Sequence, residues 1–257
     1  MVPAFRCTDE DIQWAGLSCS DQDPCPVYLE LSAVAAAGDR IFAAGNIHSE
    51  TVTLYSILLG SADAGKTWSE PYPRIRGAGL DRIQFAGPAN GWIGGETLFP
   101  LPQDPFLLIT SDSGTTWRRQ PLFSEPHPGS IQQFWFSSPQ EGSLIVDRGE
   151  GSAEERYELY ESPDGGQSWT VKQLSQKPIR LKAGPATAAT WRVRADGPTQ
   201  SFRIERHEGE RWTAEASFAV NLGVCKPVPA EPPLPPSEPL PPGPASPPAP
   251  SLRRQHP

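Results

Sequence analysis

The sequence predicts an all-β fold, a β-propeller of about four to five four-stranded blades followed by a disordered, proline-rich tail. Three observations support this prediction. A polar turn recurs about every fifty residues, each repeat holds four short apolar runs, and no stretch of useful length has helical periodicity. A four-stranded sheet cannot bury both faces alone, so such repeats stack around an axis. A two-sheet β-sandwich is the alternative, but it does not predict the repeat.

The recurring turn reads SADAGKTW at 61–68, SDSGTTW at 111–117 and SPDGGQSW at 162–169. Its aspartates are spaced by 49 and 52 residues, and in each copy a glycine follows two positions later and a tryptophan five positions later. The three sets are Asp63, Gly65 and Trp68; Asp112, Gly114 and Trp117; and Asp164, Gly166 and Trp169. A fourth copy, ERHEGERW, has His207 in place of the aspartate and keeps Gly209 and Trp212.

The pattern S-x-D-x-G-x-[TS]-W resembles the Asp-box, or BNR repeat, of sialidases and many other propellers, and the resemblance covers residues 30–216. In that family the box is a hairpin turn between the third and fourth strands of a blade. An aspartate accepts backbone N–H groups and glycine allows positive φ, so the residues suit such a turn. The three aspartates belong to different blades and cannot share one small ligand, so we interpret the boxes as structural fasteners.

The stretch ANGWIGGE at 89–96 resembles a strand entry of the photosystem II stability/assembly factor-like proteins. We divide the chain into a cysteine-containing segment at 1–26, the Asp-box propeller at 27–225 and the tail at 226–257. Fourteen of the 31 prolines lie from 227 onward, and proline lacks the donor that helices and sheet interiors need. The tail is interpreted as a spacer, with docking of its P-x-x-P spacings to an aromatic groove as the alternative.

The four cysteines lie outside the repeats, where disulfides would clamp the ends of the propeller. We favour pairs Cys7–Cys225 and Cys19–Cys25 over free thiols or a zinc site, because CSDQDPC lacks the short spacing of zinc ligands. Disulfides would indicate an oxidising compartment, so we expect a periplasmic or secreted protein, although the chain begins without a visible signal peptide.

Charge and motifs exclude several function classes. The net charge is −8 without a basic cluster, which argues against nucleic acid as a partner. No apolar run is long enough for a membrane span, and no metal-ligand or phosphate-loop spacing is present, so we expect no cofactor and no metal. We expect a monomer.

An enzyme must be weighed because the boxes resemble those of sialidases. The sialidase F/Y-R-I-P motif lies near the start of its domain, whereas SFRIE at 201–205 lies in the last repeat and lacks the proline. We therefore read Arg203 as an outward strand residue, and we predict no catalytic residues. Another glycosidase would need a carboxylate pair, and no pair stands out among acids such as Asp81, Glu96, Asp147 and Glu158.

We predict a non-enzymatic binding or assembly module for an unknown protein or glycan partner. The alternative is a carbohydrate-active hydrolase with an axial pair of carboxylates. The apolar insertion at 95–106 is the first candidate contact loop, with Phe99, Leu101 and Phe106 as anchors, unless it packs on its own blade. We assign the aromatic cluster at 123–136 to the core.

Overall fold

The computed structural model describes residues 4–99, 104–150, 155–181, 191–197, 201–220 and 222–227. The chain divides into two units, Met1–Pro227 and Val228–Pro257. The second unit, where the disordered tail is expected, lies wholly outside the described residues.

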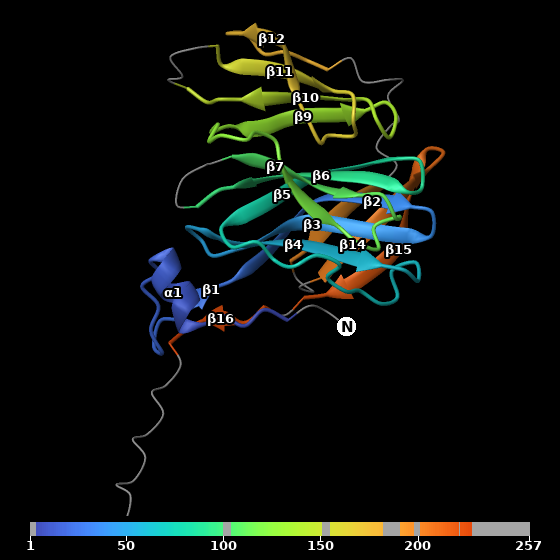
Figure 1. Ribbon diagram of the computed structural model, residues 1–257. Coiled ribbons are helices and arrows are strands. Elements are labelled where there is room, and N and C mark those ends of the chain that lie inside the picture. The colour runs from blue at the N-terminus through green and yellow to red at the C-terminus, as the bar shows by residue number, and fades with distance from the viewer. Residues whose placement is uncertain are drawn as a thin grey trace, which may run out of the picture. The chain divides into compact units, whose positions relative to one another are not determined.

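The described residues of the first unit form five antiparallel sheets: a two-stranded sheet that joins the ends, and four larger sheets that we call blades 1 to 4 in chain order (Figure 1). Blade 1 consists of β2 (Tyr28–Ala37), β3 (Arg40–His48) and β4 (Thr53–Ser61), and blade 2 of β5 (Ala78–Ala86), β6 (Asn90–Thr97), β7 (Pro105–Thr110) and β8 (Arg118–Pro121). Blade 3 consists of β9 (Ser130–Phe136), β10 (Gly142–Asp147), β11 (Tyr157–Ser162) and β12 (Thr170–Ser175), and blade 4 of β13 (Trp191–Asp196), β14 (Ser201–Glu208) and β15 (Arg211–Ala219). The predicted propeller is confirmed, with four blades.

The predicted four strands per blade hold for blades 2 and 3. In blade 1 the fourth strand is reduced to a single bridge between Gly60 and Ser69. Blade 4 has three strands among its described residues. The strands of each blade follow one another in chain order across the sheet, as short hairpin connections require.

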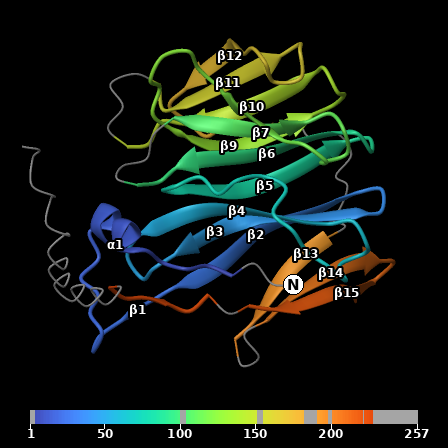
Figure 2. The same cartoon turned by 60° about the horizontal axis from the view of Figure 1, so that its bottom comes forward.

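The blades lie side by side in the order 3, 2, 1, 4 (Figures 1 and 2). An apolar core joins blade 4 to blade 1, a second joins blade 1 to blade 2, and a third joins blade 2 to blade 3. Strands between two cores are buried on both faces: all six residues of β7 are buried, which explains the unbroken apolar run PFLLIT. Among the described residues, no such core joins blade 3 to blade 4.

Two side-chain contacts illustrate how blades 2 and 3 adhere. The rings of Trp92 and Phe136 stack with centroids 3.8 Å apart, and both side chains are almost fully buried. The amide of Gln84 donates to the carbonyl of Phe136 and accepts from its N–H, at 2.7 and 2.8 Å. The aromatic cluster at 123–136 therefore contributes to the inter-blade core, as predicted.

The two ends of the first unit are joined to each other. Strand β1 (Cys25–Pro26) pairs antiparallel with β16 (Val224–Cys225). Disulfides join Cys7 to Cys225 and Cys19 to Cys25, the two pairs that the sequence analysis favours. Closing the long loop between Cys7 and Cys225 stabilises the fold by about 4 kcal/mol in the chain-entropy model.

A short helix, α1 (Asp9–Ala15), lies between these cysteines and was not expected from the sequence. Thr8 caps it: the Asp11 N–H donates to the Thr8 hydroxyl, and the Asp11 carboxylate accepts from the Thr8 N–H. This reciprocal capping box is readable in TDED as a threonine followed three residues later by an acid. Seven residues are too few to show helical periodicity, which is why the pattern search missed the helix.

Candidate functional site

The inner strands of the four blades line a cavity of about 460 Å³. We call it the axial pocket, because β2, β5, β9 and β13 each contribute to its wall. Its lining combines ionisable and aromatic side chains, a composition suited to binding a polar ligand. Its polar and aromatic lining includes Ser32, Asp81, Arg82, Phe134, Trp135 and Trp191.

Bulges in the inner strands of blades 1 to 3 place polar residues at equivalent positions. The register shifts at Ser32 in β2, at Asp81 in β5 and at Gln132 in β9, so that each is left unpaired in the ladder. A bulge adds one residue to a strand and redirects its side chain. Ser32 and Asp81 line the axial pocket, while the buried Oε1 atom of Gln132 has no hydrogen-bond partner. Sequence reasoning missed these bulges, because a single extra residue barely changes the apolar alternation.

Asp81 and Glu96 form a carboxylate pair on blade 2. Burial raises the pKa of Asp81, although Arg82 at 3.6 Å acts in the opposite direction. Burial also raises the pKa of Glu96; a hydrogen bond from Ser130 lowers it, and the charge of Asp81 raises it further. The Oε2 atom of Glu96 is buried without a hydrogen-bond partner. Such a pair retains protons more readily than ordinary acids and accepts hydrogen bonds from a ligand.

The aromatic wall of the axial pocket comes from blades 3 and 4. Phe134 and Trp135 in β9 and Trp191 in β13 are all half-buried, so part of each ring faces solvent. Exposed ring faces beside carboxylate, guanidinium and hydroxyl groups can stack on a flat or cyclic ligand while the polar groups bind its edges. The sequence analysis named Asp81 and Glu96 among the acids but did not single out the tryptophans.

The other two acids named from the sequence lie elsewhere. Asp147 pairs with Arg156 at 2.8 Å, and the hydrogen bond from this guanidinium lowers the pKa of Asp147. Glu158 is only 6 % exposed and accepts from Tyr160 at 2.8 Å, while His127 lies 2.7 Å from the same oxygen. Burial and this carboxylate raise the pKa of Tyr160. Both acids are thus held in partnered networks within blade 3.

The three repeated turns share one set of hydrogen bonds. Oδ1 of each aspartate accepts from the backbone N–H four residues later, at 2.8–2.9 Å, and Oδ2 accepts from the hydroxyl of that residue, at 2.6–2.7 Å. These bonds lower the pKa of each aspartate to about 2, for Asp164 against an opposing effect of burial. The donor residues are Thr67, Thr116 and Ser168.

A second hydroxyl completes each turn, two residues before the aspartate. It donates to Oδ1 of the aspartate and accepts from the N–H of the turn glycine. In the second turn this residue is Thr110, equivalent to Ser61 and Ser162 in the others. Each turn glycine has positive φ, between 75° and 88°.

Each turn also contacts the neighbouring blade on one side. A Cβ atom on Gly65 would lie 2.2 Å from the Cβ of Ala216 in blade 4, and one on Gly114 would lie 2.2 Å from the ring of Phe42 in blade 1. The carbonyl of Gly165, in the third turn, accepts from the Trp92 indole of blade 2 at 2.8 Å. The turns therefore close the hairpins and also fill the contact between blades.

The fourth copy of the pattern is not a turn of this kind, which corrects the repeat count. His207 and Trp212 are direct partners in the β14–β15 ladder, so ERHEGERW forms a tight hairpin around Gly209. A Cβ on Gly209 would meet no atom within 4 Å, so this hairpin contacts no other blade there. The sequence match rested on glycine and tryptophan alone, without the aspartate that makes the hydrogen bonds.

The two described anchors of the predicted contact loop, Phe99 and Phe106, both pack against other side chains of the fold. Phe106 is 1 % exposed in the core between blades 1 and 2, so its assignment as a surface anchor is wrong. Phe99 packs edge-on against Trp14 of α1, with ring centroids 4.9 Å apart. Leu101 lies outside the described residues. Phe99 thus packs on α1 and Phe106 between blades 1 and 2, rather than on their own blade alone.

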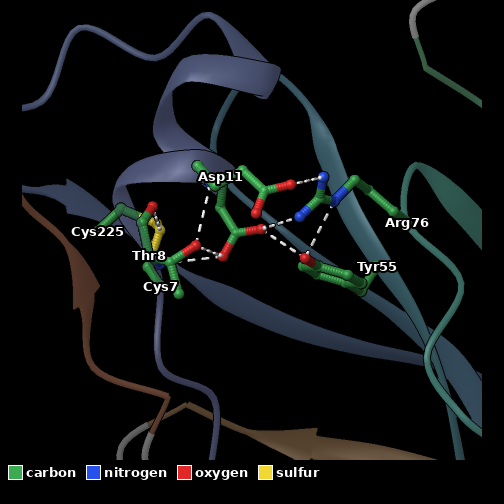
Figure 3. A network of polar contacts seen from close by, with 7 residues as sticks. Cys7, Thr8, Asp11, Tyr55, Arg76 and Cys225 are labelled. Carbon is green, nitrogen blue, oxygen red and sulfur yellow. Dashed lines mark hydrogen bonds and ion pairs between the residues drawn. A yellow bond between two sulfur atoms is a disulfide. The ribbon is translucent and has the colours of Figure 1, made fainter.

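A polar network fastens α1 to blade 1 beside the Cys7–Cys225 disulfide (Figure 3). Asp11 accepts from the Tyr55 hydroxyl at 2.5 Å, and Arg76 contacts Asp11 at 3.3 Å and Glu10 at 2.6 Å. Burial opposes ionisation of Asp11, but the hydrogen bonds from Tyr55 and Thr8 outweigh it and lower its pKa. All these groups bond to one another, so the network is a structural latch.

Two searches of the described residues bear on other site types. No group of three or more His, Cys, Asp or Glu within them could hold a metal ion. None of their helices is long and apolar enough to cross a membrane.

No protein-family model matches the chain, and no curated protein matches its sequence. Solved structures do match. YCF48 bound to D1 peptide is 17 % identical with a TM-score of 0.41, over 76 % of this chain and 58 % of that one. YCF48 from Cyanidioschyzon merolae is 16 % identical with a TM-score of 0.41, over 74 % and 57 %. The alpha-L-arabinanase of Penicillium chrysogenum complexed with arabinobiose is 13 % identical with a TM-score of 0.38, over 77 % and 62 %.

The chain therefore spans less than two thirds of the length of each of these proteins.

Proposed function

We propose that this protein is a binding module that takes a short segment of a glycan in the axial pocket. The observation that carries the proposal is the composition of that pocket: the half-buried aromatic rings of blades 3 and 4 form one wall, and the polar side chains of Ser32, Asp81 and Arg82 form the other. Sugar rings present apolar C–H faces and a rim of hydroxyls, which match stacking on aromatic rings and hydrogen bonding to Asp81 and Arg82. A volume of about 460 Å³ admits a ligand of one or two sugar units.

The experiment is a titration with soluble di- to tetrasaccharides of neutral hexoses, pentoses and uronic acids, followed by tryptophan fluorescence. Trp135→Ala and Asp81→Asn are each expected to weaken binding by about tenfold, because each removes a pocket contact. Trp14→Ala is the matched control, since Trp14 lies on α1 and outside the pocket lining. No saturable response to any sugar up to about 10 mM would reject the proposal.

A hydrolase is the second candidate, and the raised pKa values of Asp81 and Glu96 favour it. One protonated and one ionised carboxyl group is the combination that glycoside hydrolysis uses. Both acids, however, belong to neighbouring strands of blade 2 and not to opposite walls of the pocket. The oligosaccharides that bind are incubated with wild type and with Glu96→Gln to compare their hydrolysis. Release of reducing ends by wild type alone would make the protein an enzyme.

We also infer an extracytoplasmic location, because the Cys7–Cys225 and Cys19–Cys25 disulfides suit an oxidising compartment. Thiol labelling of the protein purified from its native source tests this: labelling of all four cysteines before reduction would contradict it.

A further inference from the structure

Blade 4 has two different faces, set by the alternation of its strands. On one face, Val193, Ile204 and Phe202 pack into the core shared with blade 1. Residues that alternate with these lie on the opposite side, where no apolar core among the described residues joins blade 4 to another blade. We call this side the outer face of blade 4; it is formed by Arg192, Arg194, Arg203, Glu205, His207 and Trp212.

The outer face is polar and open, in contrast to the apolar faces between the other blades. Arg203 is 52 % exposed, Arg194 is exposed, and the neighbouring Ala214 and Ser217 of β15 are exposed as well. The hairpin at Gly209 contacts no other blade, unlike the three Asp-containing turns. A polar outer side is typical of the end unit of a repeat array.

The charges on this face are only partly compensated. Glu205 is 7 % exposed and already bound to Arg192 at 2.6 Å, while Arg203 approaches it only to 3.9 Å. Arg194 lies directly opposite Arg203 in the β13–β14 register, and no described residue forms an ion pair with Arg194. Asp196, at the end of β13, is a further carboxylate on this side of the sheet. Like charges in direct cross-strand register destabilise a sheet unless an anion lies between them.

An aromatic platform adjoins the two guanidinium groups. The guanidinium of Arg192 lies 4.1 Å from the centroid of the Trp212 ring, and His207 lies 4.8 Å from it on another side. Ala214 and Ser217 have short side chains and leave these rings partly open, and the strand register shifts at Glu215 between them.

We propose that the outer face of blade 4 docks an acidic segment of a partner protein, with carboxylates bridging Arg194 and Arg203. The forked donors of arginine match carboxylates bidentately. The segment must be short, because Asp196 lies on the same face and the net charge of −8 repels any polyanion that extends beyond the two arginines. Arg192 lines the axial pocket and also packs on Trp212 of this face, so, if the pocket binds a glycan as proposed, the protein would join a glycan to an acidic protein at adjoining sites.

The test is fluorescence anisotropy with a fluorescein-labelled octapeptide of alternating Glu and Ser, at low and physiological salt. Arg194→Glu is the informative variant, because it replaces a repulsive cross-strand pair with an attractive one and should not impair folding. Binding should fall about tenfold or more in Arg194→Glu while its Tm stays equal or rises. Arg118→Glu, which makes the same charge change on β8, is the matched control and should keep most of the affinity.

Three results would overturn the proposal: no binding of the peptide by wild type, equal binding by Arg194→Glu, or an equal loss in Arg118→Glu. A single-stranded DNA oligonucleotide serves as competitor. If it displaces the peptide at lower concentration than unlabelled peptide does, the face prefers phosphate and the assignment to an acidic protein is wrong.

Discussion

The aspartates of the three turns and the Asp81–Glu96 pair of blade 2 have opposite surroundings. Each turn aspartate accepts hydrogen bonds at both oxygens, and its pKa falls to about 2. Asp81 and Glu96 have raised pKa values, and Glu96 has a buried oxygen without a donor. An acid that is fully bonded by its own chain stabilises the fold, whereas one with unused acceptors is available to a ligand.

The largest expected effect tests the turns as contacts between blades. Gly114→Ala places a Cβ 2.2 Å from the Phe42 ring and forces an alanine to φ +75°, so we expect a loss of about 3 kcal/mol or more in the free energy of unfolding. Gly87→Ala is the control, because Gly87 has φ +74° but open space around it; about 1 kcal/mol is expected there. Urea denaturation measures both. Equal losses would mean that the turn does not press on blade 1.

The next prediction compares one acid from each group under the same substitution. Asp112→Ala removes the acceptor for Thr116 and Thr110. The free energy of unfolding should therefore fall by about 1–2 kcal/mol, after allowance for solvent screening. Asp81→Ala removes a carboxylate whose only close partner is Arg82 at 3.6 Å, and its stability should change by less than about 0.5 kcal/mol. Thermal denaturation of both variants decides the comparison, and a larger loss for Asp81 would reverse the assignment.

The sequence allowed the turns to be predicted because their information is local. Asp63, Gly65 and Trp68 interact within eight residues, and the same spacing recurs twice. The disulfide pairs followed from a similarly simple fact, the position of the cysteines on either side of the repeats.

The axial pocket could not be predicted in this way, because its residues are brought together by the stacking of blades. Asp81 and Trp191 are 110 residues apart and line one cavity, and no spacing rule connects them. The bulge that exposes Asp81 is a property of strand pairing. His207 shows the opposite failure: a local resemblance to the turn was read as a fourth copy where the ladder forms a tight hairpin.

A smaller effect, on pH dependence, separates the two groups in one titration. The turn aspartates have pKa values below those of an unfolded chain, so their stabilisation is present above about pH 4 and is lost as pH falls toward 2. Asp81 and Glu96 have raised pKa values, so they destabilise the fold when ionised, and stability falls as pH rises through those values.

Urea denaturation from pH 2 to pH 8 measures this, with two variants assigning the slopes. Asp112→Asn should reduce only the loss of stability below about pH 4. Glu96→Gln should reduce only the decline in stability above about pH 4.5. A wild-type stability that rises steadily from pH 2 to pH 8 would show that ionised Asp81 and Glu96 do not destabilise the fold.

The smallest expected effect is that of Glu96→Gln on stability at pH 7. The amide removes a charge from a buried, unpartnered Oε2 and can still accept the Ser130 hydrogen bond, so we expect a gain of up to about 1 kcal/mol. Glu158→Gln is the matched control: this buried acid is bonded to Tyr160 and His127, and the same change should cost about 1–3 kcal/mol. If the fold keeps this unfavourable carboxylate for ligand binding, Glu96→Gln should gain stability and lose ligand affinity. Equal losses in the two variants would instead place Glu96 with the structural acids and remove the contrast between the turn aspartates and the Asp81–Glu96 pair.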